Sequence, residues 1–245
     1  MTINEYTNLI RLGFTESEIA NMNYSEFKNN RALIGKIIAS STKYYKVIES
    51  TYLNSTIEIT EEEYNKTNLS MPLKSDGYIE TTYKKVTTTI ISLSNYYRYK
   101  INVEWKNMPS KRSYDIIAIG KDSNVSIIGS ITFQQNYCYS NGNCYTNSSF
   151  IPKTDNYGGA AFFQLPSSSS VSSLSSYMYY TISKNTSNTI YTLNAYGDYA
   201  HATSTTYQSY VNNFSVNSLG IILDSSIISK YDEIPIAQAT SSVNW

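Results

Sequence analysis

The strongest constraint on the fold is a two-residue alternation of apolar and polar side chains that recurs after about residue 78. It is clearest over residues 98–105, where four apolar residues alternate with four polar ones: Tyr99, Ile101, Val103 and Trp105 with Arg98, Lys100, Asn102 and Glu104. Successive side chains of a β-strand point to opposite faces, so the pattern predicts a strand with one buried face and one solvated face. Such strands belong to antiparallel sheets, because parallel strands are covered on both faces.

The same period recurs further along the chain. The apolar positions are Ile127, Ile131 and Phe133; Met178, Tyr180 and Ile182; Tyr191, Leu193 and Ala195; and Tyr210, Phe214 and Val216. Turn-forming residues separate these segments, namely Gly77, Met108-Pro109, Asn156-Tyr157-Gly158 and Gly197. We therefore predict a mainly β fold, an antiparallel β-sandwich, over residues 77–245.

The first 42 residues predict a short helical region instead. A Ser/Thr/Asn-x-x-Glu motif, which caps helix N-termini, occurs as Thr2/Glu5, Thr15/Glu18 and Asn23/Glu26. Gly13 stands where a left-handed residue commonly ends a helix. Leu33, Ile34, Ile37 and Ile38 have helical spacing and predict one more helix. Its apolar face would pack either on the β-domain or on a partner.

Residues 43–76 predict a hairpin followed by a connection. β-forming residues run from Lys43 to Tyr52, and a second run covers residues 56–59 after Asn54-Ser55. Thr60 with Glu63 repeats the capping motif and predicts a helical turn over residues 61–65. The polar connection over residues 66–76 is the expected boundary, which gives three regions: 1–42, 43–76 and 77–245.

The two cysteines, Cys138 and Cys144, flank a predicted hairpin. If Ser140, Asn141 and Gly142 form a three-residue loop, Gly142 takes the left-handed position and the cysteines face each other. Directly opposed residues at a non-hydrogen-bonded pair have Cα atoms about 4.5 Å apart, which a disulfide tolerates. We therefore predict a disulfide, and with it an oxidising compartment. Two thiols and one histidine do not make a four-ligand zinc site, so no metal is expected.

The charge balance argues against several classes of partner. The 19 Lys and Arg residues equal the 19 Asp and Glu residues, so no basic surface for nucleic acid is expected. No stretch approaches the roughly 18 apolar residues that a membrane-spanning helix needs. Residues 1–12 show no signal peptide, so we expect that an exported form is already trimmed.

No residue is assigned a catalytic role, and no cofactor is predicted. His201 is the only histidine, and a Ser-His-Asp triad would depend on it, but there is no Gly-x-Ser-x-Gly motif. A hydrogen-bonded structural role is therefore the default for His201. The acidic residues also read as structural: residues 61–63 as a helix start, Glu104 on a solvated strand face, and Asp232 and Glu233 in a surface loop.

Aromatic residues suggest a binding role. The faces of tyrosine rings suit sugars and peptides, and the tyrosines of interest are Tyr96, Tyr97, Tyr177, Tyr179, Tyr196 and Tyr199. His201 and Arg112 complete this candidate ligand-binding set, with Arg112 able to bind a carboxylate or to face water. The alternative is cross-strand packing, because tyrosine is a good strand former.

Two resemblances bear on function. Residues 105–117, from Trp105 to Ile117, and the opening Leu12-Gly13-Phe14 to Glu18-Ile19 and Asn21-Met22 resemble uncharacterised secreted proteins of Gram-positive bacteria. That resemblance implies export and a β-rich fold, but no activity. Residues 167–176 predict a flexible serine-rich loop, and together with the alternating polar strand that follows they resemble in composition the Ser/Thr-rich insertion segments of aerolysin-type pore formers.

These observations predict an extracellular, non-enzymatic module that recognises a glycan, a peptide or another component of the cell envelope. The alternative is a β-pore-forming toxin of the aerolysin type. A hydrolase that uses His201 is the third hypothesis. The oligomeric state does not follow from the sequence.

Overall fold

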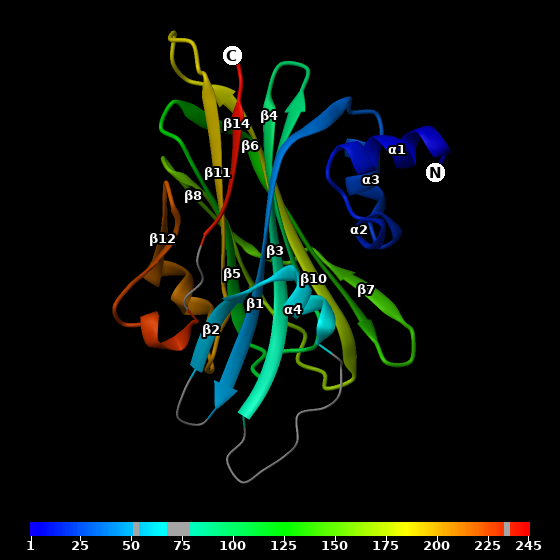
Figure 1. The fold of residues 1–245 in the computed structure, drawn as a ribbon, viewed down its shortest axis with the longest axis vertical. Helices are drawn as coiled ribbons and strands as arrows, with labels where there is room; N and C mark the ends of the chain where they lie inside the picture. The colour runs from blue at the N-terminus through cyan, green and yellow to red at the C-terminus, as the bar shows by residue number, and fades with distance from the viewer. Residues whose placement is uncertain (51–53, 68–78, 233–235) are drawn as a thin grey trace.

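The protein is an antiparallel β-sandwich, as predicted. The computed structural model describes residues 1–50, 54–67, 79–232 and 236–245, and two sheets face each other in it (Figure 1). The larger sheet has the order β2 (Asn54–Ile59), β1 (Gly35–Ser50), β3 (Ile79–Leu93), β4 (Tyr97–Trp105), β10 (Val171–Lys184), β6 (Val125–Tyr139) and β7 (Cys144–Asn147). The smaller has the order β14 (Ala237–Ser242), β11 (Thr192–Ala200), β5 (Tyr114–Lys121), β9 (Gly158–Gln164) and β8 (Ile151–Asp155).

The main core lies between the two sheets. Tyr99, Ile101, Val103 and Trp105, the apolar positions of the clearest alternation, are all at most 5% exposed and belong to this core. Gly197 does not form a turn, contrary to the prediction, but lies inside strand β11. A Cβ atom there would be 1.9 Å from Thr88 Oγ1 on β3, so glycine lets the two sheets approach each other.

Three short helices precede the sandwich: α1 (Ile3–Arg11), α2 (Glu16–Ala20) and α3 (Tyr24–Asn30). Thr2 and Thr15 form the predicted capping boxes, and Asn23 caps α3 by accepting from the Glu26 N–H at 2.9 Å. Gly13 has the expected left-handed φ of 77° between α1 and α2. The helical region is thus confirmed up to residue 30.

The further helix predicted from Leu33 to Ile38 is wrong, because β1 begins at Gly35. Strand β1 pairs with β3, with Ile37 opposite Ile91 and a register shift between Ile37 and Ala39. The bulge breaks the two-residue alternation, so that neighbouring isoleucines resemble one face of a helix. The predicted hairpin is confirmed by the pairing of β1 with β2. Helix α4 (Glu61–Lys66) follows behind Thr60.

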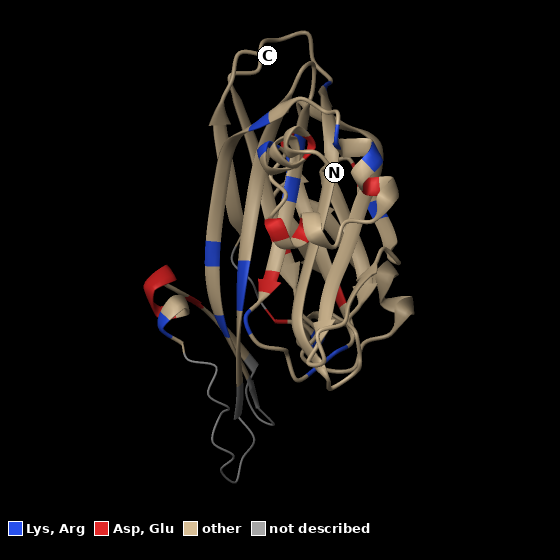
Figure 2. Cartoon of the chain, turned by 90° about the vertical axis from the view of Figure 1, so that its right-hand side faces the viewer, with Lys and Arg blue, Asp and Glu red and all other residues tan. Residues whose placement is uncertain are grey.

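The polar face of β4 is not solvated, which corrects the prediction. Arg98, Lys100 and Asn102 are only 4%, 2% and 4% exposed, because the N-terminal helices lie on this face of the larger sheet. Figure 2 views the molecule from the side that carries these helices. Glu104, nearer the end of the strand, is half-buried and pairs with Lys85 at 2.9 Å. The helices therefore add a third layer to the sandwich.

A fourth layer covers the other side of the smaller sheet. The hairpin of β12 (Phe214–Asn217) and β13 (Gly220–Leu223) packs there together with two 3₁₀ turns, η1 (Gln208–Asn213) and η2 (Ile228–Lys230). The serine-rich segment was predicted to be a loop, but residues 171–176 form the start of β10 and pair with β4 and β6. Gly77, Glu233 and most of the connection over residues 66–76 lie outside the described residues.

Candidate functional site

The six candidate tyrosines do not form one surface. Tyr177 and Tyr179 are 0% and 6% exposed beneath the N-terminal helices, and Tyr199 is buried between the sheets. Tyr97 packs edge-on against Trp245, with ring centroids 4.8 Å apart. The other two are more accessible, since Tyr96 is 44% exposed and Tyr196 is half-buried on the smaller sheet. An exposed platform built from the whole set is therefore absent.

His201 lies in a buried polar cluster between the sheets. Its Nδ1 is 2.9 Å from Asp115 Oδ2, and the Tyr199 hydroxyl donates to the same oxygen at 2.5 Å. The His201 backbone N–H donates to Asp232 at 2.6 Å, and the Trp105 ring meets the imidazole edge-on. The imidazole is 0% exposed, so a substrate does not reach it in this structure.

Asp232 belongs to the same cluster, which corrects its assignment to a surface loop. It is 6% exposed, and its Oδ2 pairs with Lys84 Nζ at 2.5 Å and accepts from Thr56 Oγ1 at 2.8 Å. Asp198 lies nearby, and burial raises the pKa of its carboxyl to about 6. Buried charges need partners, and the chain supplies them from distant segments.

Arg112 joins two loops and does not project freely. Its Nε donates to the Pro109 carbonyl at 3.2 Å, and its Nη1 donates to the Ser168 carbonyl. The guanidinium thus holds the end of the β4–β5 connection against the loop before β10. In the β6–β7 hairpin, Cys138 and Cys144 form the predicted disulfide, with Cα atoms 4.0 Å apart and φ of +86° at Gly142.

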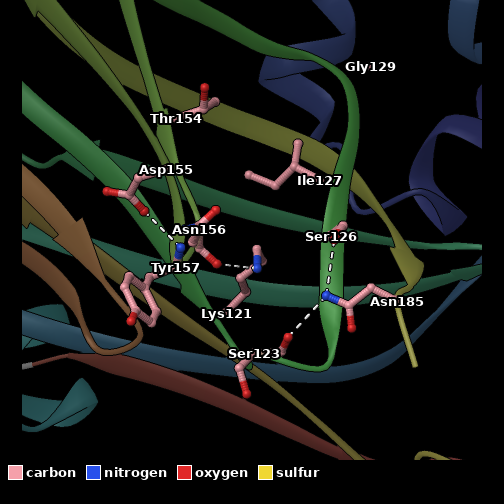
Figure 3. A pocket seen from close by; sticks show the side chains of 10 residues that line it. All are labelled: Lys121, Ser123, Ser126, Ile127, Gly129, Thr154, Asp155, Asn156, Tyr157 and Asn185. Atoms are coloured by element: carbon pink, nitrogen blue, oxygen red, sulfur yellow. Dashed lines mark hydrogen bonds between the residues drawn. The ribbon is translucent and has the colours of Figure 1, made fainter. Parts of the chain in front are cut away.

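A polar hollow at one end of the sandwich is the best candidate site. It has a volume of about 610 Å³ and is formed by the end of β5, the start of β6, the β8–β9 turn and the residue after β10 (Figure 3). The lining residues are Lys121, Ser123, Ser126, Ile127, Gly129, Thr154, Asp155, Asn156, Tyr157 and Asn185. Nearly all of them offer hydroxyl, amide or charged groups.

Hydrogen bonds within the walls fix the shape of this hollow. Lys121 Nζ donates to the carbonyls of Val125 and Asn156, both at 2.6 Å, and burial lowers the pKa of its ammonium group. Asp155 accepts from the backbone N–H of Tyr157 at 2.8 Å and from that of Val216 at 3.1 Å. Both charged side chains are therefore engaged in holding the walls together.

Several side chains of the hollow are accessible to a ligand, Tyr157 and Asn185 among them. The Tyr157 ring is 51% exposed at the β8–β9 turn. Asn185 is exposed as well, and its amide donates to the Ser123 carbonyl at 3.0 Å and to Ser126 Oγ at 3.1 Å. The lining contains no histidine or cysteine, so the site offers hydrogen bonds and a ring face but no activated nucleophile.

This hollow was not predicted from the sequence. Asn156 and Tyr157 were read only as turn formers, and Asn185 was not singled out. The one local signal for an exposed ring is an aromatic residue at the tip of a predicted Asn-x-Gly turn, and this signal was not used. The assembly of the hollow from four separate segments is a tertiary property that no local pattern contains.

Within the described residues, no three His, Cys, Asp or Glu side chains gather closely enough to hold a metal ion. No helix in that part of the chain has the length and apolarity to cross a membrane.

Comparisons with known proteins find little similarity. No protein-family model and no curated protein matches the sequence. A solved structure titled "BspA_C_WT" aligns over 83% of this chain and 85% of its own, with 5% identity and a TM-score of 0.32. This similarity is too low to support a functional argument. The resemblance to secreted Gram-positive proteins stays a prediction.

Proposed function

We propose that the protein is an extracellular, non-enzymatic module that binds an uncharged glycan in the hollow beside Tyr157. The proposal rests on one observation: a polar hollow of about 610 Å³ places an accessible tyrosine ring next to amide and hydroxyl groups. A sugar offers an apolar ring face and several hydroxyls, so it complements this combination.

The walls favour an uncharged ligand over an ionic one. The lining holds one cation and one carboxylate, Lys121 and Asp155, and both form hydrogen bonds to backbone groups of the walls, so the hollow has no excess charge for an ionic ligand. The disulfide at the β6–β7 hairpin supports an oxidising, extracellular environment, since such bonds are rare in the cytosol.

A glycan array probed with the full chain tests this proposal. Wild type should bind at least one uncharged glycan, and Tyr157→Ala should weaken that binding at least about tenfold, because the stacking face is lost. Tyr191→Ala is the matched control, since Tyr191 is 70% exposed but does not line the hollow. Binding that survives in Tyr157→Ala, or that falls equally in both variants, would refute the assignment.

A further inference from the structure

The N-terminal helices contact the larger sheet through a buried ionic cluster. Glu18 of α2 accepts from Lys100 Nζ with both carboxylate oxygens, at 2.9 and 2.8 Å, and also accepts from the Asn102 amide. On α3, Glu26 accepts from the Tyr179 hydroxyl at 2.7 Å. The carboxylates of the helices thus lie on a cationic, polar area of β4 and β10.

The covered area resembles a ligand-binding surface in its chemistry. The rings of Tyr177 and Tyr179 are parallel within 4°, with centroids 6.5 Å apart. Arg98 lies 4.1 Å from the centroid of the Tyr179 ring, and Lys100 lies 5.0 Å from that of Tyr177. Two aromatic rings and two cations therefore form one continuous surface, which we call the covered face: Arg98, Lys100, Asn102, Asn136, Tyr177 and Tyr179.

The helices provide hydrogen-bond partners for only some of the buried polar atoms of the covered face. Four of its buried polar atoms have no hydrogen-bond partner among the described residues: Arg98 Nε, Asn102 Oδ1, Asn136 Nδ2 and the Tyr177 hydroxyl. All four residues are at most 4% exposed. Buried polar groups are nearly always hydrogen-bonded in native proteins, so this concentration of unpaired groups in one interface needs an explanation.

A groove leads from solvent to the edge of the covered face. It has a volume of about 470 Å³ and lies between α2 and the strands, with Glu16 and Ser17 on one side and Lys85 and Ser175 on the other. Asn136 lines this groove and also belongs to the covered face. A ligand can therefore approach the margin of the helices without unfolding the sandwich.

We propose that the covered face is a second binding site, specific for an acidic oligosaccharide, and that the Glu18 carboxylate occupies the position of a ligand carboxylate while the helices are closed. The two tyrosines offer aromatic rings and hydroxyl groups to a sugar, and Lys100 with Asn102 suits a uronate carboxylate in place of Glu18. This site is independent of the hollow beside Tyr157, because the two share no residue.

Opening of the helices is compatible with their contacts. Separation returns Lys100 and Glu18 to water, which recovers the hydration that a buried ion pair loses. Apolar contacts from Leu9, Leu12 and Phe14 keep the helices closed in the absence of ligand. The apparent affinity is then the intrinsic affinity reduced by the fraction of molecules that are open.

Tetragalacturonate is a suitable probe, with galactotetraose as the uncharged control of the same length. In the wild-type chain, saturating tetragalacturonate should accelerate amide hydrogen exchange over residues 3–31, because the ligand displaces the helices. Galactotetraose should not. This measurement needs no variant, and unchanged exchange with tetragalacturonate would overturn the proposal.

Variants test the two parts of the mechanism separately. Leu9→Ala removes apolar packing of α1 and replaces no residue of the covered face, and it should raise the affinity for tetragalacturonate at least about tenfold. Adding Lys100→Gln should cancel that gain, whereas adding Lys36→Gln, on the exposed start of β1, should not. Equal affinity in the Lys100→Gln and Lys36→Gln chains would contradict the assignment. Tyr157→Ala should leave tetragalacturonate binding unchanged, which separates failure of this site from failure of the hollow.

Discussion

Asp198 makes the stability of the sandwich depend on pH in the direction opposite to that of most acidic groups. Its carboxylate accepts from the backbone N–H of Tyr199 at 2.8 Å and from that of Ile221 at 2.9 Å. Burial nevertheless raises the pKa to about 6, against the lowering effect of those bonds and of Lys84, while Asp232 adds repulsion. Between its ordinary pKa of 3.8 and about 6, the folded chain holds this proton and the unfolded chain does not.

The size of the effect follows from the pKa difference. Below about pH 4 both states are protonated and Asp198 imposes no ionisation penalty. As pH rises through 6 the penalty becomes complete, and at about 1.4 kcal/mol per pH unit it reaches about 3 kcal/mol. Asp198→Asn cannot ionise and loses one of the two accepted bonds, which costs about 1 kcal/mol. The free energy of unfolding of the variant, relative to that of wild type, should therefore rise by about 3 kcal/mol between about pH 4 and pH 7.5.

Urea unfolding of both proteins, without reductant and at a series of pH values, measures this difference. Asp224→Asn is the control with the opposite sign, because hydrogen bonds from Ser226 lower the pKa of the exposed Asp224 carboxyl. The stabilisation that the Asp224 carboxylate provides in wild type should be lost as pH falls. A difference between Asp198→Asn and wild type that stays constant across the pH range would show that Asp198 is not buried as an acid with a raised pKa.

Three further changes have defined outcomes. Gly197→Ala places a methyl group against Thr88 and should cost about 2 kcal/mol in the free energy of unfolding. Adding Thr88→Ala should restore part of this loss. Thermal melts of the single and double variants check both expectations. Replacing Cys138 and Cys144 by serine opens a short loop and should cost about 2 kcal/mol in the free energy of unfolding, measured with urea. A cost above about 4 kcal/mol would show that the disulfide stabilises more than this short loop. Lys84→Met leaves the buried Asp232 carboxylate without its cation and should cost about 3–5 kcal/mol in the free energy of unfolding. The double variant with Lys84→Met and Asp232→Asn should recover most of this loss, and an equal loss in both chains would argue against the ion pair.

Local patterns in the sequence predicted those elements whose signal lies within a few residues. The capping motifs at Thr2, Thr15 and Thr60 each fix one helix start, because the cap and its partner are three residues apart. The disulfide hairpin is equally local, since the loop length sets which residues face each other. The alternation over residues 98–105 gave the strand correctly but assigned its polar face to water.

That error shows what local patterns do not contain. Arg98 and Lys100 look solvated in sequence because a charged residue is normally exposed. Their partners, Asn30 and Glu18, lie 68 and 82 residues away, so only the tertiary structure reveals the pairing. Asp232 was misassigned for the same reason, since Lys84 lies 148 residues away. The hollow beside Tyr157 likewise depends on how four segments meet, and the sequence pattern did not indicate it.

Strands β3 and β4 place buried cations on both faces of the larger sheet, and this arrangement determines how the peripheral segments attach. Lys84 points toward the smaller sheet and binds Asp232 near the C-terminal end, whereas Lys100 points outward and binds Glu18 near the N-terminal end. An apolar residue at either position would accept many packing partners, but a buried cation needs a polar partner in a defined position, and for Lys84 and Lys100 that partner is a carboxylate. We infer that these two ion pairs select one docking position for each terminal segment. The two attachments differ in reversibility, because Asp232 is enclosed between the sheets while Glu18 lies under helices bordered by an open groove. The N-terminal attachment is therefore the one that we propose a competing carboxylate displaces when the helices open.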